Sequence, residues 1–172
     1  MYTDPYQINL QESGSLSISG RPRGYDWLEN EIDAWCKSGV THLISLLEPK
    51  EALNLGLRDE AFLSKQAKMS FTNFSIPDMQ IPCNPNQFID LALNLSQEIQ
   101  SGQWIHIHCR SGIGRCALMA TTILYFLGYE PKEAMDLVSQ YRKLQVPDTE
   151  EQKTFILDLP SLIETSNRII CL

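Results

Sequence analysis

The chain has no surplus of basic residues. It contains 14 lysines and arginines against 21 aspartates and glutamates, so its formal net charge is −7. A nucleic-acid binder needs a basic face to hold the phosphate backbone, and an anionic membrane attracts basic surfaces, not acidic ones. We therefore expect neither nucleic acid nor a membrane as a partner. Any phosphate bound by this protein must be held locally, by a few residues.

Long hydrophobic runs and disulfide signatures are missing as well. The longest apolar run, ALMATTILYFLG from Ala117, is about half of the ~20 residues that a spanning helix needs, so we interpret it as a core helix. An odd number of scattered cysteines without a C-x-x-C pair indicates reduced cytoplasmic thiols. Without repeats, the 172 residues fit a single domain, 1–172. The cysteines are Cys36, Cys83, Cys109, Cys116 and Cys171.

Strand-like and helix-like segments alternate along the chain. Such alternation predicts parallel β-α-β units and an α/β fold, in which a central, mostly parallel twisted sheet is flanked by helices. Residues 1–24 are expected to form an edge hairpin. Asn84 and Pro85 are the expected N-cap and first position of a helix that ends at Gly102. Strands are predicted at 40–47, 70–76 and 104–109, and helices from Tyr25 to Ser38, at 58–68, at 115–127, from Pro131, and from about Thr149 onward.

Ligands of such sheets bind beyond the carboxyl ends of the strands. Two loops fall there, PDMQIPCNP (77–85) and CRSGIG (109–114). We call the second one the cysteine loop. The two loops are therefore the predicted walls of the functional site.

The cysteine loop has the residues needed to activate a sulfur atom. A free cysteine with a pKa of ~8.5 is only about 3% thiolate at neutral pH. At the end of a strand and facing a helix N-terminus, Cys109 gains orphan N–H groups that favour its charged form. Gly112 and Gly114 let the backbone take positive φ and approach a ligand closely, and Arg115 can fork two oxygens of a phosphate. The pattern predicts a thiolate aimed at a tetrahedral oxyanion.

Asp78 is the candidate proton donor for this chemistry. A thiolate cleaves a phosphate ester poorly unless the departing oxygen receives a proton. Asp78 lies 31 residues before Cys109 and follows Pro77, on the loop expected beside the cysteine loop. We expect in-line attack by Cys109, protonation of the leaving group by Asp78, and then hydrolysis with Asp78 acting as base.

Taken together, these residues resemble a known signature. His108, Cys109, five intervening residues and Arg115 are similar to the HCx5R loop of cysteine-dependent protein phosphatases, the tyrosine and dual-specificity superfamily. The stretch from IHIHCRSGIGRCALMATTILYFLG through EPKEAMDLV looks closest to the compact dual-specificity branch, which includes the kinase-associated phosphatase group. The resemblance covers roughly residues 15–165. It implies the protein tyrosine phosphatase-like fold, no cofactor, no metal and a phosphorylated protein as substrate.

The family roles carry over by position. The resemblance implies Cys109 as nucleophile, Arg115 as phosphate clamp, Asp78 as general acid, and His108 as a residue that tunes the thiolate. The intervening residues are implied to bind phosphate through their backbone amides; they are Arg110, Ser111, Gly112, Ile113 and Gly114.

Two positions depart from the family pattern. Cys116 stands where the family has a serine or threonine whose hydroxyl stabilises the leaving thiolate, and a thiol is a poor donor. We therefore expect slower breakdown of the phosphoenzyme, for which Ser111 is a candidate compensation. In DTEEQ (148–152), Thr149 and Gln152 match the tail of the glutamine motif that positions water in tyrosine-specific members.

Several alternatives stand beside this interpretation. A catalytically weak phospho-partner binding module on the same fold is kept open by Cys116. Metal binding by His106, His108 and Cys109 is disfavoured because no fourth ligand is nearby. Cys83 or Cys116 could trap oxidised Cys109 as a disulfide, although two unrelated thiols are the simpler interpretation.

The loop composition bears on the substrate. Only Arg110 is basic among the five intervening residues, whereas phosphoinositide members of the superfamily tend to carry extra lysines. We therefore expect a phosphoprotein substrate and a shallow pocket that admits phosphotyrosine and also phosphoserine or phosphothreonine. A kinase- or cyclin-type partner is raised by the resemblance alone.

Overall fold

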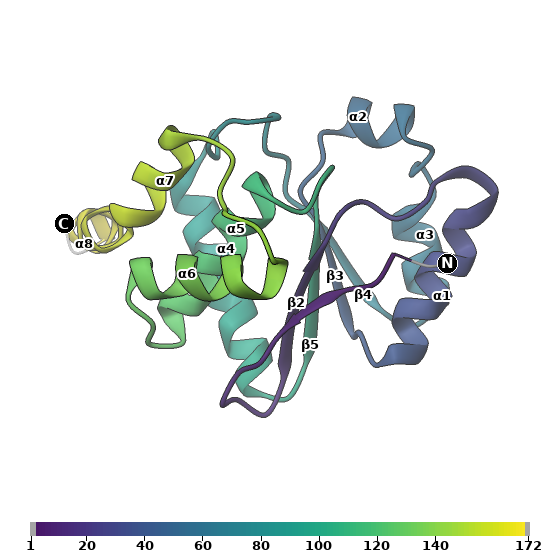
Figure 1. The fold of residues 1–172 in the computed structure, drawn as a ribbon, viewed down its shortest axis with the longest axis horizontal. Coiled ribbons are helices and arrows are strands. Elements are labelled where there is room, and N and C mark those ends of the chain that lie inside the picture. The colour runs from purple at the N-terminus through teal and green to yellow at the C-terminus, as the bar shows by residue number, and fades with distance from the viewer. Residues whose placement is uncertain (1–2, 171–172) are drawn as a thin grey trace.

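The computed structural model describes the backbone of residues 3–170 and the side chains of residues 3–165; Cys171 lies outside these ranges. Its centre is a five-stranded sheet in the order β1-β2-β5-β3-β4 (Figure 1). β1 pairs antiparallel with β2, and every other pairing is parallel. This confirms the predicted α/β class. The strands are Tyr6–Ile8 (β1), Ser15–Ser19 (β2), His42–Ser45 (β3), Ser70–Asn73 (β4) and Trp104–His108 (β5).

Helices cover both faces of the sheet, and each face has its own hydrophobic cluster. α1 and α3 lie on one side in Figure 1, and α4, α5 and α6 lie on the other. A short 3-10 turn, Tyr25–Trp27, precedes α1. The helices are Leu28–Ser38 (α1), Pro49–Asn54 (α2), Glu60–Gln66 (α3), Pro85–Gln100 (α4), Gly114–Phe126 (α5), Pro131–Arg142 (α6), Glu150–Leu157 (α7) and Leu159–Ile170 (α8). None of the described helices is both long and apolar enough to cross a bilayer.

The strand register brings three strand ends together at one residue. His108, the last residue of β5, pairs with Ser19 at the end of β2 and with Ser45 at the end of β3. The loop after β5 therefore leaves the sheet between the loops that follow its two neighbours. This is the edge at which ligands of parallel sheets bind.

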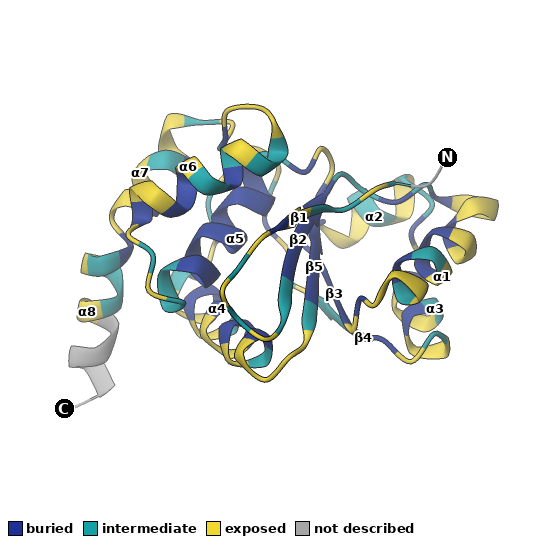
Figure 2. Ribbon diagram, turned by 60° about the horizontal axis from the view of Figure 1, so that its bottom comes forward, coloured by how far each residue is buried: buried dark blue, intermediate teal, exposed yellow. Residues whose placement is uncertain are grey.

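α5 anchors the cysteine loop. It is buried from Gly114 to Leu124, which Figure 2 shows as dark blue between α4 and α6. A helix that is apolar nearly all round is stable only inside a core, where each large apolar side chain contributes about 1.5–3 kcal/mol. The first turn of α5, which closes the cysteine loop, is therefore held rigidly.

Most predicted elements are present, with three differences. The hairpin within residues 1–24 forms, but only β1 is at the edge, because β2 also pairs with β5. α2 was not predicted, since six residues are too few to show helical periodicity. The final helix is two helices, α7 and α8, with a break at Asp158. The expected cap of α4 is confirmed: Asn84 accepts a hydrogen bond from the Gln87 amide at 3.2 Å, and Pro85 begins the helix.

Candidate active site

The cysteine loop turns tightly between β5 and α5. Gly112 has a φ of +71°, and a Cβ there would lie 2.6 Å from the Gly20 nitrogen. Only glycine fits this position without strain. Gly114 was expected to need positive φ too, but only Gly112 does. Gly114 instead packs closely against the C-terminal part of the chain: a Cβ there would lie 2.6 Å from Asp148 Oδ2 and from Gln152 Oε1, so these two side chains would have to shift.

Cys109 lies at the bottom of this loop with its sulfur surrounded by donors. Its side chain is 1% exposed, and the Gly112 amide donates to Sγ at 3.2 Å. The pKa of Cys109 is lowered to about 6, although burial alone would raise it. The largest cause is a hydrogen bond from the Cys116 thiol. A hydrogen bond from the Cys116 amide and the charge of Arg115 lower the pKa further. About nine-tenths of the sulfur is then thiolate at pH 7.

Cys116 thus contributes to the low pKa of Cys109, which the sequence interpretation did not foresee. Its thiol also donates to the backbone carbonyls of Ser19 at 3.6 Å and of Ile107 at 3.7 Å. It is fully buried, and burial together with the neighbouring Cys109 raises the pKa of its own thiol well above the ordinary value. The proton therefore stays on Cys116 while Cys109 ionises. Cys83, the other thiol considered as a redox partner, is exposed on the 77–85 loop.

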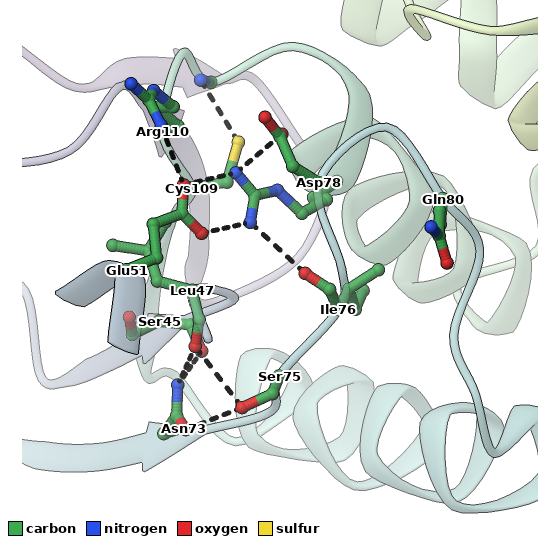
Figure 3. Close-up of polar contacts among 12 residues, drawn as sticks. Ser45, Leu47, Glu51, Asn73, Ser75, Ile76, Asp78, Gln80, Cys109 and Arg110 are labelled. Atoms are coloured by element: carbon green, nitrogen blue, oxygen red, sulfur yellow. Dashed lines mark hydrogen bonds and ion pairs between the residues drawn. The ribbon is translucent and has the colours of Figure 1, made fainter. Parts of the chain in front are cut away.

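The guanidinium of Arg115 is 2% exposed. It is held by the carboxylates of Glu51 and Asp78, which are both labelled in Figure 3. Glu51 accepts from Nη1 at 2.7 Å and from Nη2 at 3.0 Å, in a bidentate pair. Asp78 Oδ1 lies 2.9 Å from Nη2, and the Ile76 carbonyl accepts from Nη1 at 3.2 Å. Burial lowers the pKa of Arg115, but the hydrogen bond and charge of Glu51 and the charges of Cys109 and Asp78 raise it overall, so it stays cationic.

Glu51 was not identified from the sequence. It lies on α2, the element that the sequence pattern also missed, and its pKa is lowered: burial, the largest single effect, would raise it, but Arg115 outweighs burial. Its bidentate contact fixes the plane of the guanidinium. Asp78, by contrast, has a half-exposed side chain at the rim of the site.

Gln152 and Asp148 hold the start of α5 from the C-terminal side. Gln152 is fully buried, its Nε2 donates to the Gln80 carbonyl at 3.0 Å, and its Oε1 has no hydrogen-bond partner among the described residues. Gln152 therefore links the loop of Asp78 to the cysteine loop. The Gly114 amide, assigned to substrate from the sequence, donates to Asp148 at 2.9 Å.

Behind the loop lie two buried histidines whose pKa values are shifted in opposite directions. Nε2 of His108 is 2.9 Å from Oε1 of Glu60, and both side chains are buried. Burial alone would lower the pKa of His108, but Glu60 and Cys109 raise it overall. His106 lies 2.9 Å from the hydroxyls of Ser17 and Ser19, and burial lowers its pKa to about 3, so it is neutral. A hydrogen-bonded core position explains His106 without a metal.

Arg142 is a further residue that the sequence interpretation missed. From the end of α6, its Nε donates to the Gly112 carbonyl at 3.0 Å and its Nη2 to the Ser111 carbonyl at 2.9 Å. Its guanidinium also lies 4.3 Å from the ring centroid of Tyr6. Arg142 thus occupies the Ser111 and Gly112 carbonyls, while the Gly112 amide donates to the Cys109 sulfur.

Comparison with known proteins agrees with this arrangement. A family model described as "Polymorphic toxin system, DSP-PTPase phosphatase" matches residues 19–129. No curated protein has a matching sequence.

Solved structures share the fold. Kinase associated phosphatase (KAP), with its catalytic cysteine substituted by serine, has a TM-score of 0.86 at 16% identity, covering 95% of this chain and 97% of that chain. Tk-PTP in its active form has a TM-score of 0.74 at 22% identity, covering 92% and 97%. PTPMT1 in complex with PI(5)P has a TM-score of 0.71 at 18% identity, covering 91% and 96%. Because the family model matches more than half of the chain, this protein belongs to the DSP-PTPase phosphatase family of polymorphic toxin systems, within the cysteine-based phosphatase superfamily.

Proposed function

We propose that this chain is a phosphoprotein phosphatase that hydrolyses phosphotyrosine, and also phosphoserine and phosphothreonine, through a cysteinyl-phosphate intermediate. The observation that carries the proposal is the environment of Cys109. Its buried sulfur has amide, thiol and guanidinium neighbours, and its pKa is lowered to about 6. A structural cysteine in a core would be a neutral thiol with a raised pKa. The reduced thiols fit a cytoplasmic protein.

In the first step, Sγ of Cys109 attacks phosphorus in line with the leaving oxygen. A sulfur–phosphorus bond forms and the phosphorus–oxygen bond breaks. A bound phosphate competes with Asp78 for Nη2 of Arg115, because both are anions on the same nitrogen. The Asp78 carboxyl group, released from Arg115 at the rim of the site, is then the proton donor for the leaving oxygen.

In the second step, water attacks the phosphocysteine with Asp78 as base. The free amide oxygen of Gln152 is a candidate acceptor for this water. The departing thiolate recovers the hydrogen bond from the Cys116 thiol that stabilises it in the free enzyme. A thiol donor can thus replace the usual hydroxyl, which favours turnover over a pure binding module.

The cavity in front of the loop suits a peptide. It has a volume of about 510 Å³ and is lined mostly by polar side chains of α2 together with Asp78 and Arg110. Three of its lining residues are acidic (Glu48, Glu51 and Asp78) and two are basic (Lys50 and Arg110), and the lack of a net positive charge disfavours a headgroup carrying several phosphates in this cavity. We propose phosphorylated proteins as partners. A kinase- or cyclin-type partner is raised only by the fold likeness to KAP and is not part of this proposal.

The test compares wild type, Cys109→Ser and Asp78→Ala on p-nitrophenyl phosphate and on phosphotyrosine, phosphothreonine and phosphoinositide substrates. We expect many turnovers by wild type, none by Cys109→Ser, and slow turnover by Asp78→Ala, most affected on peptides because their leaving groups are poor. If wild type bound phosphopeptides without hydrolysing them, the chain would be a phospho-partner binding module and not an enzyme. Turnover by Cys109→Ser at the wild-type rate would overturn the mechanism.

A further inference from the structure

α2 borders two cavities with two different faces. Lys50 and Glu51 line the cavity in front of the cysteine loop. Pro49, Ala52 and Leu53 line another cavity, of about 340 Å³, which we call the α2 cavity. Positions i, i+3 and i+4 fall on one side of a helix, so α2 lies between the two cavities.

The walls of the α2 cavity are mostly apolar. Besides the three residues of α2, Ala61 of α3 and Phe71 of β4 line it. Its polar lining includes Ser45 and Asn73, both labelled in Figure 3. Leu53 is 56% exposed, and an apolar ligand would remove this surface from water. The volume also lies in the range of ~300–1,000 Å³ that is typical of small-molecule sites.

The charge that the α2 cavity leaves unpaired is positive. Arg58, on the segment between α2 and α3, lines the cavity and is exposed. No carboxylate in the described part of the chain lies within ion-pair distance of it. The acidic residue of the cavity, Glu60, is instead buried, with its Oε1 2.9 Å from His108 Nε2. An apolar cavity beside an unpaired guanidinium favours an apolar molecule with one carboxylate.

The walls of the α2 cavity also connect it to the catalytic residues. Glu51, on α2, accepts from Arg115 at 2.7 and 3.0 Å. Glu60 pairs with His108, which directly precedes Cys109 in the chain. None of the six residues of α2 is buried, so little packing holds this helix in place. A molecule in the α2 cavity packs against the apolar face of α2 and thereby holds Glu51 where it contacts Arg115.

We propose that the α2 cavity is an effector site for a small apolar molecule that carries a single carboxylate. The apolar part packs against Leu53 and Phe71, and the carboxylate pairs with Arg58. By holding Glu51, the bound molecule fixes the plane of the Arg115 guanidinium and strengthens phosphate binding at the cysteine loop. A small molecule fits better than a protein partner, because a protein interface needs ~800 Å² of surface on each partner. Binding in this cavity does not depend on the proposed phosphatase function, but the effect on phosphate rests on it.

Binding is measured by titration calorimetry of the full chain with phenylacetate and with octanoate. Phenylacetamide is the matched neutral ligand, and acetate is the carboxylate without an apolar part. Both apolar carboxylates should bind with a Kd of about 1 mM or tighter, and the amide and acetate about tenfold more weakly. If neither carboxylate binds at about 10 mM, or if the amide binds as tightly as phenylacetate, the proposal is overturned.

Variants locate the site. Arg58→Ala should weaken phenylacetate binding about tenfold, and Arg58→Lys should keep part of the affinity. Ala61→Phe, which fills the cavity, should abolish binding. The control Lys65→Ala removes an exposed cation at the other end of α3 and should change nothing. Unchanged binding by Arg58→Ala overturns the location, and tighter binding of a tripeptide that ends in phenylalanine overturns the small-molecule assignment.

Inorganic phosphate tests the link to the cysteine loop. Saturating phenylacetate should tighten phosphate binding about fivefold or more, and phosphate should tighten phenylacetate binding by the same factor. Competition between the two would place the carboxylate on the cysteine loop and overturn the location. An unchanged phosphate affinity overturns the effector role. A chain that binds phenylacetate but no phosphate overturns the phosphatase function and leaves the binding site standing.

Discussion

Replacement of Cys116 by alanine should raise the pKa of Cys109. Cys116 is fully buried, and its thiol gives the largest single contribution to the low pKa of Cys109. A hydrogen bond to a charged acceptor contributes about 1.5–3 kcal/mol, and a thiol belongs at the low end of this range because S–H is a weak donor. About 1.5 kcal/mol corresponds to roughly one pKa unit, so the pKa of Cys109 should rise from about 6 to ~7 in Cys116→Ala.

The same substitution should change how stability depends on pH. Because the pKa of Cys109 is lower in the folded protein than in the unfolded chain, its thiolate stabilises the fold at alkaline pH, and this contribution is lost as pH falls through about 6. In wild type the free energy of unfolding should therefore rise between pH 6 and the ordinary thiol pKa near ~8.5. In Cys116→Ala this rise should be smaller by about 1.5 kcal/mol.

The assay is the rate of Cys109 alkylation by iodoacetamide across pH, read by peptide mass spectrometry so that the exposed Cys83 does not contribute. Cys116→Ser is the matched control, because its hydroxyl is a donor of similar size and should keep the pKa of Cys109 near the wild-type value. An unchanged pKa in Cys116→Ala, or an equal rise in both variants, would refute the argument that the Cys116 side chain ionises Cys109.

Three further outcomes are expected. Glu60→Gln should lower the pKa of His108, because the Glu60 carboxylate raises it. The charged form of His108 then loses this stabilisation at acidic pH. An NMR titration that finds the same His108 pKa in the variant and in wild type would contradict the ion pair. Peroxide should convert the Cys109 thiolate to sulfenic acid, which condenses with the Cys116 thiol to a disulfide and water; recovery of only sulfinic or sulfonic Cys109 in peptide maps contradicts this. Asn84→Ala should cost about 1 kcal/mol of unfolding free energy in urea without changing p-nitrophenyl phosphate turnover, because it removes only the α4 cap, whereas unchanged stability would argue against the cap.

Local signals account for what the sequence could predict. Cys109, Gly112 and Arg115 lie in one short segment. The residues around them favour a strand before the cysteine loop and a helix after it, and the glycines favour a tight turn between the two. The alternation of strands and helices then predicted a parallel sheet, which predicted that the loop of Asp78 meets the cysteine loop. The structure places Asp78 against Arg115, 2.9 Å apart.

What could not be predicted depends on the register of distant segments. Glu51 and Arg115 are 64 residues apart, and only the sheet order brings α2 beside the cysteine loop. Glu60 and Arg142 likewise look like ordinary surface charges of amphipathic helices until the fold turns them inward. A charged residue on a short helix has no periodic signal that distinguishes a buried partner from an exposed one.

The central claim is that the Cys109 sulfur becomes bonded to phosphorus during turnover. Rapid acid quench of wild type or Asp78→Ala reacting with p-nitrophenyl phosphate, followed by peptide mass spectrometry under acidic conditions, tests this directly. We predict one phosphoryl group on the peptide that contains Cys109, and none on the same peptide from Cys109→Ser. Steady turnover with no phosphoryl group on Cys109 at any quench time, or with the group on another residue, would contradict the account.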